Sequence, residues 1–102
     1  MNTKITLIID NPADPAAFEA AYPGIRSAAT TLPGLLRYEE GKVFPKEDGT
    51  PTPAYRTLDL YFTDYDAASL AVLSEQAATL FTGLAAADGT VTGLFSEVQT
   101  AG

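Results

Sequence analysis

The residue best placed for chemistry is Asp59, a carboxylate in an otherwise apolar stretch. It lies between Leu58 and Leu60, and apolar or aromatic residues follow directly. A buried aspartate must be paired or protonated, because burying an isolated charge is costly. Asp59 is therefore either a catalytic or ligand-binding carboxylate, or a structural acid that bonds Tyr, Thr or Arg across the fold. Both interpretations stay open.

Other candidate site residues could bind a ligand or its charge. Arg26 could hold a carboxylate or enolate bidentately, which makes it the second candidate catalytic residue, or it could be a solvated helix residue. Aromatic side chains supply a broad apolar wall, and tyrosine adds a polar tip. The candidate ligand-binding residues are Tyr22, Tyr38, Tyr55, Tyr61 and Phe95. The alternative is that these aromatics pack in the core or at a subunit interface.

The absences exclude several kinds of site. The chain has no His and no Cys, so it can form no zinc finger, disulfide framework, Ser-His-Asp triad or cysteine nucleophile. Glu39 and Glu40 alternate along a strand, so their carboxylates point to opposite faces. The other clustered acids suit helix caps and turns better than a hard-metal site. We expect no metal and no cofactor.

The charge pattern limits the partners. Thirteen acidic residues face six basic ones, for a net charge of -7, and no basic residue follows Arg56. Phosphate backbones and anionic lipids need clustered Lys and Arg, so we expect neither nucleic acid nor membrane as a partner. No apolar run reaches the ~20 residues of a membrane span. The first residues lack the pattern of a signal peptide, so cytoplasm is the default expectation.

The first half of the chain should form a strand, a helix and a second strand. Residues 3–9 are rich in β-branched residues and apolar on both faces, which predicts a central strand. Asp14-Pro15 predicts an N-cap and a first helical residue, and Pro23-Gly24 predicts a kink or break near Tyr22. Residues 35–44 predict a strand with a bulge at Gly41.

The second half of the chain should form a strand, a helix and a last strand. After a loop at 45–53, residues 55–62 alternate, with one apolar face and one that bears Tyr55, Thr57, Asp59 and Tyr61. Asp64 or Asp66 should cap a second helix, in which leucines and alanines repeat at spacings of three and four up to Leu84. Residues 90–98 predict the last strand, with Leu94 and Phe95 on opposite faces.

The order β-α-β-β-α-β predicts one α+β domain over residues 1–102. Right-handed crossovers place both helices on one face of the sheet, as in a ferredoxin-like sandwich with the first and third strands central. The other face is then bare, and an apolar sheet face must be covered. A second copy of the chain is the simplest cover, so we expect a homodimer.

Four short motifs, in this order and spacing, resemble the EthD family over nearly the whole chain. They are Asp10-Asn11-Pro12, the helix start from Asp14 to Phe18, Leu32-Pro33-Gly34 with the five residues after it, and Asp59-Leu60-Tyr61-Phe62. The resemblance implies a dimeric α+β barrel, in which two ferredoxin-like sheets face each other around a pocket. Relatives belong to ether-fuel breakdown, aromatic degradation and polyketide pathways, and many have no assigned reaction.

The chain departs from this family in its first helix. Members usually carry a His there, in the pattern Tyr-x-x-x-His-x-Pro-Leu. Counting forward from Tyr22 places Arg26 at that position, and counting back from Leu32-Pro33-Gly34 places Ile25 there. An activity that needed the imidazole as acid or base cannot be carried over to this chain.

Two hypotheses follow. The first is a homodimer whose apolar barrel pocket binds a small aromatic or polyketide-like molecule, with or without cyclisation, dehydration, isomerisation or cofactor-free oxidation. The second is a non-catalytic accessory or interaction protein that has lost the first-helix His. Whether the protein is an enzyme stays open.

Overall fold

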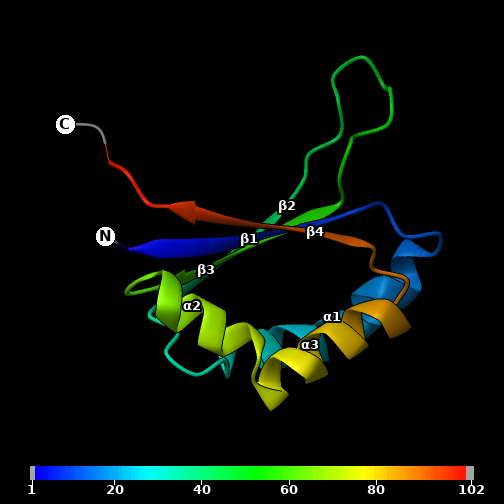
Figure 1. The fold of residues 1–102 in the computed structure, drawn as a ribbon. Coiled ribbons are helices and arrows are strands. Elements are labelled where there is room, and N and C mark those ends of the chain that lie inside the picture. Colours follow the sequence, from blue (N-terminus) through cyan, green and yellow to red (C-terminus); the bar gives the residue numbers. More distant parts are fainter. Residues whose placement is uncertain (1, 101–102) are drawn as a thin grey trace.

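The fold was analysed in a computed structural model, which describes residues 2–100 as four strands and three helices. Along the chain these are β1 (Thr3–Ile9), α1 (Pro15–Thr30), β2 (Arg37–Lys42), β3 (Arg56–Phe62), α2 (Tyr65–Val72), α3 (Glu75–Ala86) and β4 (Val91–Glu97). The strands form one antiparallel sheet in the order β2-β3-β1-β4. All three helices lie on one face of it (Figure 1). The predicted ferredoxin-like α+β fold is confirmed.

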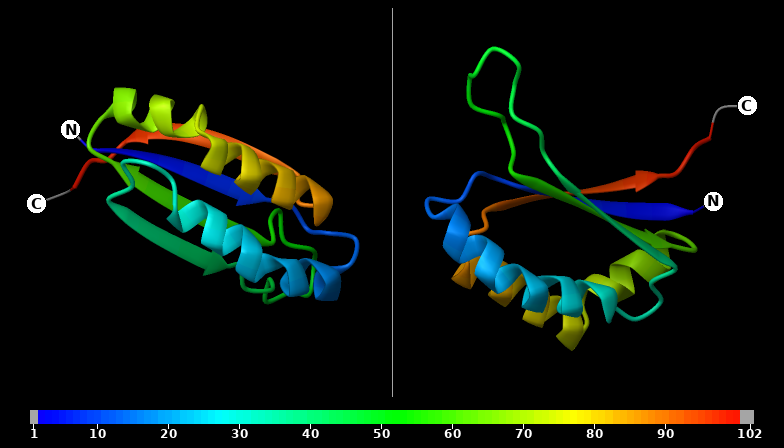
Figure 2. Two further views of the ribbon diagram at one scale, coloured as in Figure 1. Left: turned by 90° about the horizontal axis from the view of Figure 1, so that it is seen from below. Right: turned by 180° about the vertical axis from the view of Figure 1, so that it is seen from behind.

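The two central strands follow the predicted alternation. In β1 and β3 every second residue is buried beneath the helices, because side chains of a strand alternate between the faces. The fully buried core side chains of these strands are Ile5, Leu7, Ile9, Leu58, Leu60 and Phe62. The opposite face, which we call the open face, carries Thr6, Asp59 and Tyr61, and none of the described helices covers it (Figure 2).

Helix α1 begins as predicted but does not break. The Asp14 carboxylate accepts a hydrogen bond from the Ala17 amide, and the helix then continues through Pro23 to Thr30. Of the kink or break predicted near Tyr22, the break is absent. Proline removes one backbone hydrogen bond from a helix. Here Tyr22 and Ile25, which flank Pro23 and are 2% and 3% exposed, anchor both sides of it in the core.

The predicted second helix is two helices. Asp64 caps α2, and Ser74 starts α3 by accepting a hydrogen bond from the Ala77 amide. The leucines before this break, Leu70 and Leu73, are 69% and 81% exposed, so the predicted apolar face does not include them. Their regular spacing misled the prediction, because a serine cap ends and restarts the helix without changing the apolar pattern.

The predicted bulge at Gly41 is absent. Strands β2 and β3 pair in unbroken register, with Gly41 opposite Thr57. A Cβ atom on Gly41 would lie 2.9 Å from the Thr57 Oγ1 atom. Glycine here leaves room for the Thr57 side chain of the neighbouring strand and does not mark an extra residue.

A long connection, residues 43–55, joins β2 to β3, and we call it the arm. One backbone hydrogen bond, from the Val43 amide to the Tyr55 carbonyl at 3.0 Å, closes its base. Beyond that bond the arm projects from the end of the sheet on the side away from the helices (Figure 1). The arm therefore extends past the open face.

One charged residue lies in the core region. Arg56 at the start of β3 is 8% exposed. Its Nε and terminal nitrogens donate to the two Glu19 carboxylate oxygens of α1 at 3.0 and 2.6 Å. The guanidinium lies 4.0 Å from the centre of the Tyr22 ring. This ion pair and stacking contact join β3 to α1.

Replacing Glu19 by Gln should destabilise the protein by about 2–3 kcal/mol, because it leaves the Arg56 charge buried without a carboxylate. Because Glu19 is partly exposed, the expected loss of stability is smaller than for a fully buried ion pair. Urea unfolding would measure the change, with Glu47→Gln on the exposed arm as the matched control. Equal stability of the two variants would contradict a central role for this ion pair.

Candidate functional site

Two polar clusters lie on opposite faces of the sheet. Residues paired across β2 and β3 share a face, so Arg37, Glu39 and Gly41 lie on the open face, whereas Tyr38, Glu40 and Lys42 lie on the helix side. We define the open-face cluster as Lys4, Thr6, Arg37, Glu39, Asp59 and Tyr61. We define the helix-side cluster as Tyr22, Arg26, Tyr38 and Glu40.

Asp59 lies at the centre of the open-face cluster. The Thr6 hydroxyl donates a hydrogen bond of 2.6 Å to its Oδ1 atom, and the Lys4 ammonium lies 3.9 Å from the same atom. The Asp59 side chain is 26% exposed. The prediction that Asp59 faces away from the helices is confirmed, and the carboxylate is held in place by two neighbours from β1.

Tyr61 is the second predicted site residue in this cluster. Its hydroxyl donates to Glu39 at 2.8 Å, and Arg37 forms an ion pair with the same carboxylate. These bonds from Tyr61 and Arg37 lower the pKa of Glu39, and the bond to Glu39 raises the pKa of Tyr61. Tyr61 is thus a neutral hydrogen-bond donor at ordinary pH and a poor general base.

The helix-side cluster brings together three predicted residues through one that was not predicted. Glu40 accepts hydrogen bonds from the Tyr22 hydroxyl at 2.5 Å and from the Tyr38 hydroxyl at 2.9 Å. Arg26 forms an ion pair with the same carboxylate at 2.8 Å. The alternation of Glu39 and Glu40 could have identified Glu40, since it places one of the two carboxylates under α1.

The contacts of Glu40 determine the protonation of its neighbours. Desolvation acts to raise the pKa of Glu40, but the hydrogen bonds from Arg26, Tyr22 and Tyr38 outweigh it and lower this pKa to about 2. Burial, followed by the bond to Glu40, raises the pKa of Tyr22 well above its usual range. The guanidinium of Arg26 is bound within the chain, so it differs from the free ligand-binding group that was predicted.

The remaining predicted aromatics lie elsewhere. Tyr55 departs from the alternation of β3, and its ring packs edge-on against Phe18 of α1 at 5.5 Å. Phe95 is on the helix side of β4 and lies 5.5 Å from the ring of Tyr65. The five predicted ligand-binding aromatics therefore do not line one pocket, because strand alternation and the sheet ends distribute them over both faces.

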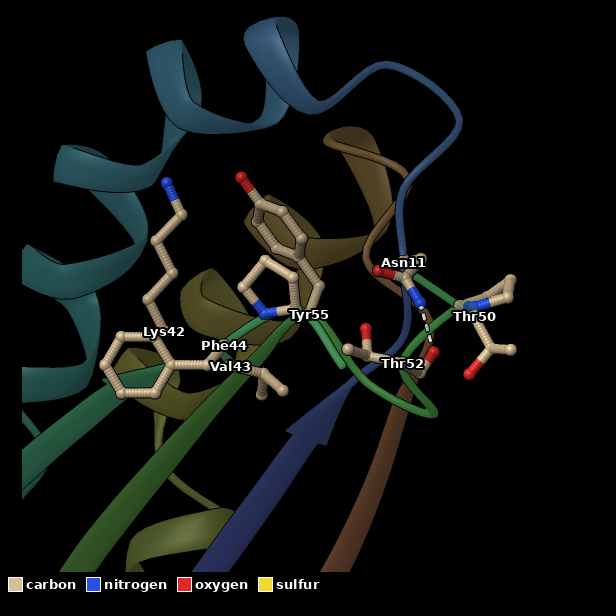
Figure 3. A pocket seen from close by; sticks show the side chains of 9 residues that line it. Asn11, Lys42, Val43, Phe44, Thr50, Thr52 and Tyr55 are labelled. Atoms are coloured by element: carbon tan, nitrogen blue, oxygen red, sulfur yellow. Dashed lines mark hydrogen bonds between the residues drawn. The ribbon is translucent and has the colours of Figure 1, made fainter. Parts of the chain in front are cut away.

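Two concave sites among residues 2–100 lie outside both clusters. One cavity of about 590 Å³ opens at the base of the arm and is bordered by Tyr55, Lys42 and Asn11 (Figure 3). Another of about 630 Å³ runs along small residues of α1 and α3, Gly24 and Gly83 among them. Over the same residues no acidic cluster could hold a metal ion, and no helix has the length and apolarity to cross a membrane.

The depressed pKa of Glu40 makes stability depend on pH in a defined window. A carboxyl group with a pKa lower in the folded state than in the unfolded chain stabilises the fold above its unfolded value near 4.5, and this contribution is lost as pH falls towards 2. Unfolding free energy should thus fall between these values, and Glu40→Gln should flatten the fall. Glu47→Gln is the control; an unchanged slope in Glu40→Gln would contradict the coupling.

Comparison with known proteins adds a sequence relative and structural neighbours. No family model matches the chain. An uncharacterized 11.0 kDa protein from the thcB-thcC intergenic region of Rhodococcus erythropolis is 32% identical over 99 residues, which cover 95% of each chain.

Several solved structures share the fold. An EthD family protein from Bacillus halodurans superposes with a TM-score of 0.86 at 17% identity, over 97% of this chain and 100% of its own. SnoaB from Streptomyces nogalater, a cofactor-independent oxygenase, gives 0.70 at 17% identity over 98% and 95%. A dimeric ferredoxin-like protein of unknown function from Thermobifida fusca gives 0.74 at 11% identity over 96% and 92%.

The fold agrees with the motif pattern found in the sequence. The Rhodococcus protein matches along almost the full chain, and the first of these structures superposes over nearly all of it. The chain therefore belongs to the same family as the Rhodococcus protein and has the ferredoxin-like α+β fold seen in the EthD family protein from Bacillus halodurans.

Proposed function

We propose that the protein is a homodimer that binds a small aromatic or polyketide-like molecule between the open faces of its two sheets. The observation that carries this proposal is the open-face cluster around Asp59. A hydrogen-bonded carboxylate on an uncovered sheet face, beside aromatic and apolar side chains, is the arrangement expected where a second layer encloses a ligand.

The open face favours a second copy as its cover. It combines the polar open-face cluster with the apolar side chains of Ile8 and Leu94, and Leu94 is 50% exposed. A sheet with one bare face is completed by packing against another layer. Structural neighbours include proteins described as dimeric and ferredoxin-like. The arm extends on the same side, where it would lie against the second copy.

Asp59 is the residue we assign to ligand recognition. With Oδ1 bonded to Thr6, the carboxylate can accept a further hydrogen bond from a phenol or enol of the ligand. Lys4 and Arg37 add positive charge around an oxygen that gains negative charge during enolisation. Holding a flexible ligand in one geometry then favours cyclisation, dehydration or isomerisation without strong acids or bases. SnoaB, a cofactor-independent oxygenase, makes cofactor-free oxidation a further option.

A second candidate is a non-catalytic accessory protein, and the first helix favours it. Ile25 is 3% exposed in the core, and Arg26 is bound by Glu40, so neither position that aligns with the family's His supplies a free acid or base. Turnover separates the two candidates: an accessory protein would bind the ligand and release it unchanged.

Dimerisation through the open face has a direct test. Light scattering coupled to sizing should give twice the 10.7 kDa mass of one chain at micromolar concentration. Leu94→Glu should shift the protein to monomer, because it places a charge in the interface. The control is Leu70→Glu on α2, which replaces another exposed leucine, one that lies on the helix side of the sheet. A monomeric parent protein would overturn the dimer.

The role of Asp59 can be tested with a hydroxyanthraquinone as the polyketide-like probe. Asp59→Asn should weaken its binding about tenfold, since a charged acceptor bonds a phenol more strongly than a neutral amide does. Asp66→Asn in the exposed first turn of α2 is the control, and sizing would verify that both variants remain dimers. Equal affinity in Asp59→Asn and the parent would remove Asp59 from the site while leaving the pocket intact.

A further inference from the structure

The cavity at the base of the arm has the size and walls of a small-molecule site. Its volume of about 590 Å³ lies within the ~300–1,000 Å³ common for such sites. The arm residues Val43 and Phe44 lie on one side of the Tyr55 ring, and Thr50 and Thr52 lie on the other (Figure 3). Phe44 is 87% exposed, so its ring at the cavity wall is free to contact a bound molecule.

The far side of the cavity is held in place by a contact between two loops. The Asn11 side-chain nitrogen, from the loop after β1, donates a hydrogen bond of 2.8 Å to the Thr52 carbonyl of the arm (Figure 3). At the opposite end, the Tyr55 ring packs against Phe18 in the core. The cavity thus lies between two fixed walls of a single chain.

Lys42 supplies a positive charge at the wall of this cavity. Its ammonium lies 3.6 Å from the Glu19 Oε1 atom and 5.8 Å from the centre of the Tyr55 ring. The Glu19 carboxylate, however, is already bound through both oxygens by Arg56, at 2.6 and 3.0 Å. Because one guanidinium neutralises that carboxylate, the Lys42 charge is in excess.

The surroundings of Lys42 contrast with the rest of the molecule. The chain as a whole is acidic, with a net charge of -7. Between α1 and the ends of β2 and β3, the cations Lys42, Arg56 and Arg26 face only two carboxylates, Glu19 and Glu40. One further negative charge beside Lys42 would balance this group. An apolar cavity with a single excess ammonium favours an anion with a flat apolar body.

We propose that the arm-base cavity binds an aromatic monocarboxylate, with the carboxylate on the Lys42 ammonium and the ring between Phe44 and Tyr55. This site is separate from the open-face site, since Lys42 and Asp59 lie on opposite faces of the sheet. It requires no second copy of the chain, so the proposal stands or fails independently of the dimer.

The test compares naphthoate with its uncharged analogue naphthamide, by calorimetry and by amide chemical shifts. Naphthoate should bind at least about tenfold more tightly, and its shifts should centre on Val43, Phe44 and Tyr55. Lys42→Met should abolish this preference for the anion, and Lys42→Arg should retain it. Lys46→Met, which removes an exposed lysine of the same arm, is the matched control and should bind naphthoate as the parent does.

Three results would overturn the proposal: no naphthoate binding, an equal preference for the anion in Lys42→Met and the parent, or shifts centred on Asp59 and Tyr61. The last result would instead assign the ligand to the open face. Lys42 has an exposed side chain, so its variants should fold, and thermal unfolding of each would verify this. Phe44→Ala adds a second measure, since it should weaken naphthoate and naphthamide equally.

Discussion

Burial of the Arg56 guanidinium is the constraint on which the helix side of the molecule depends. A charge in that position needs a carboxylate, and Glu19 of α1 provides it through both oxygens. The guanidinium stacks on Tyr22, whose own hydroxyl is then directed to Glu40 of the edge strand. Glu40 in turn is neutralised by Arg26. Each group satisfies the one before it, so α1, β2 and β3 are joined by one continuous polar network.

This network determines which polar side chains can still bind a ligand. Three side chains whose types suit ligand binding already bond to Glu40 within the chain: Arg26, Tyr22 and Tyr38. Asp59 is held from one side only, by Thr6 and Lys4 of β1. Lys42 adjoins a carboxylate that already has its partner. Two groups therefore keep the capacity to bind a ligand: Asp59, which lies on the open face outside the network, and Lys42, which lies at its edge on the helix side.

The sequence was a good guide wherever one physical rule acted alone. Period-two alternation correctly predicted β1, the apolar face of β3 and the outward position of Asp59, and Asp14-Pro15 correctly marked the start of α1. It failed where tertiary packing competed with a local signal. Pro23 predicted a break that the buried neighbours of α1 prevent. Tyr55 lies where the strand ends, so alternation could not place it against Phe18. Glu40 was missed because two of its partners, Arg26 and Tyr22, come from α1, 14 and 18 residues away in the chain.

The acidic residues around the exposed leucines at the end of α2 oppose association through these leucines. On an uncharged surface, the exposed side chains of Leu70 and Leu73 would favour association between molecules. The elements around them, α2, α3 and their caps, contain Asp64, Asp66 and Glu75 and no basic residue. Two molecules that approached through these leucines would bring like charges together at short range. The acidic residues of α2 and α3 thus repel a second molecule at low salt, and this repulsion weakens as ions screen the charges. High protein concentration and high salt are therefore the conditions under which this surface would begin to associate.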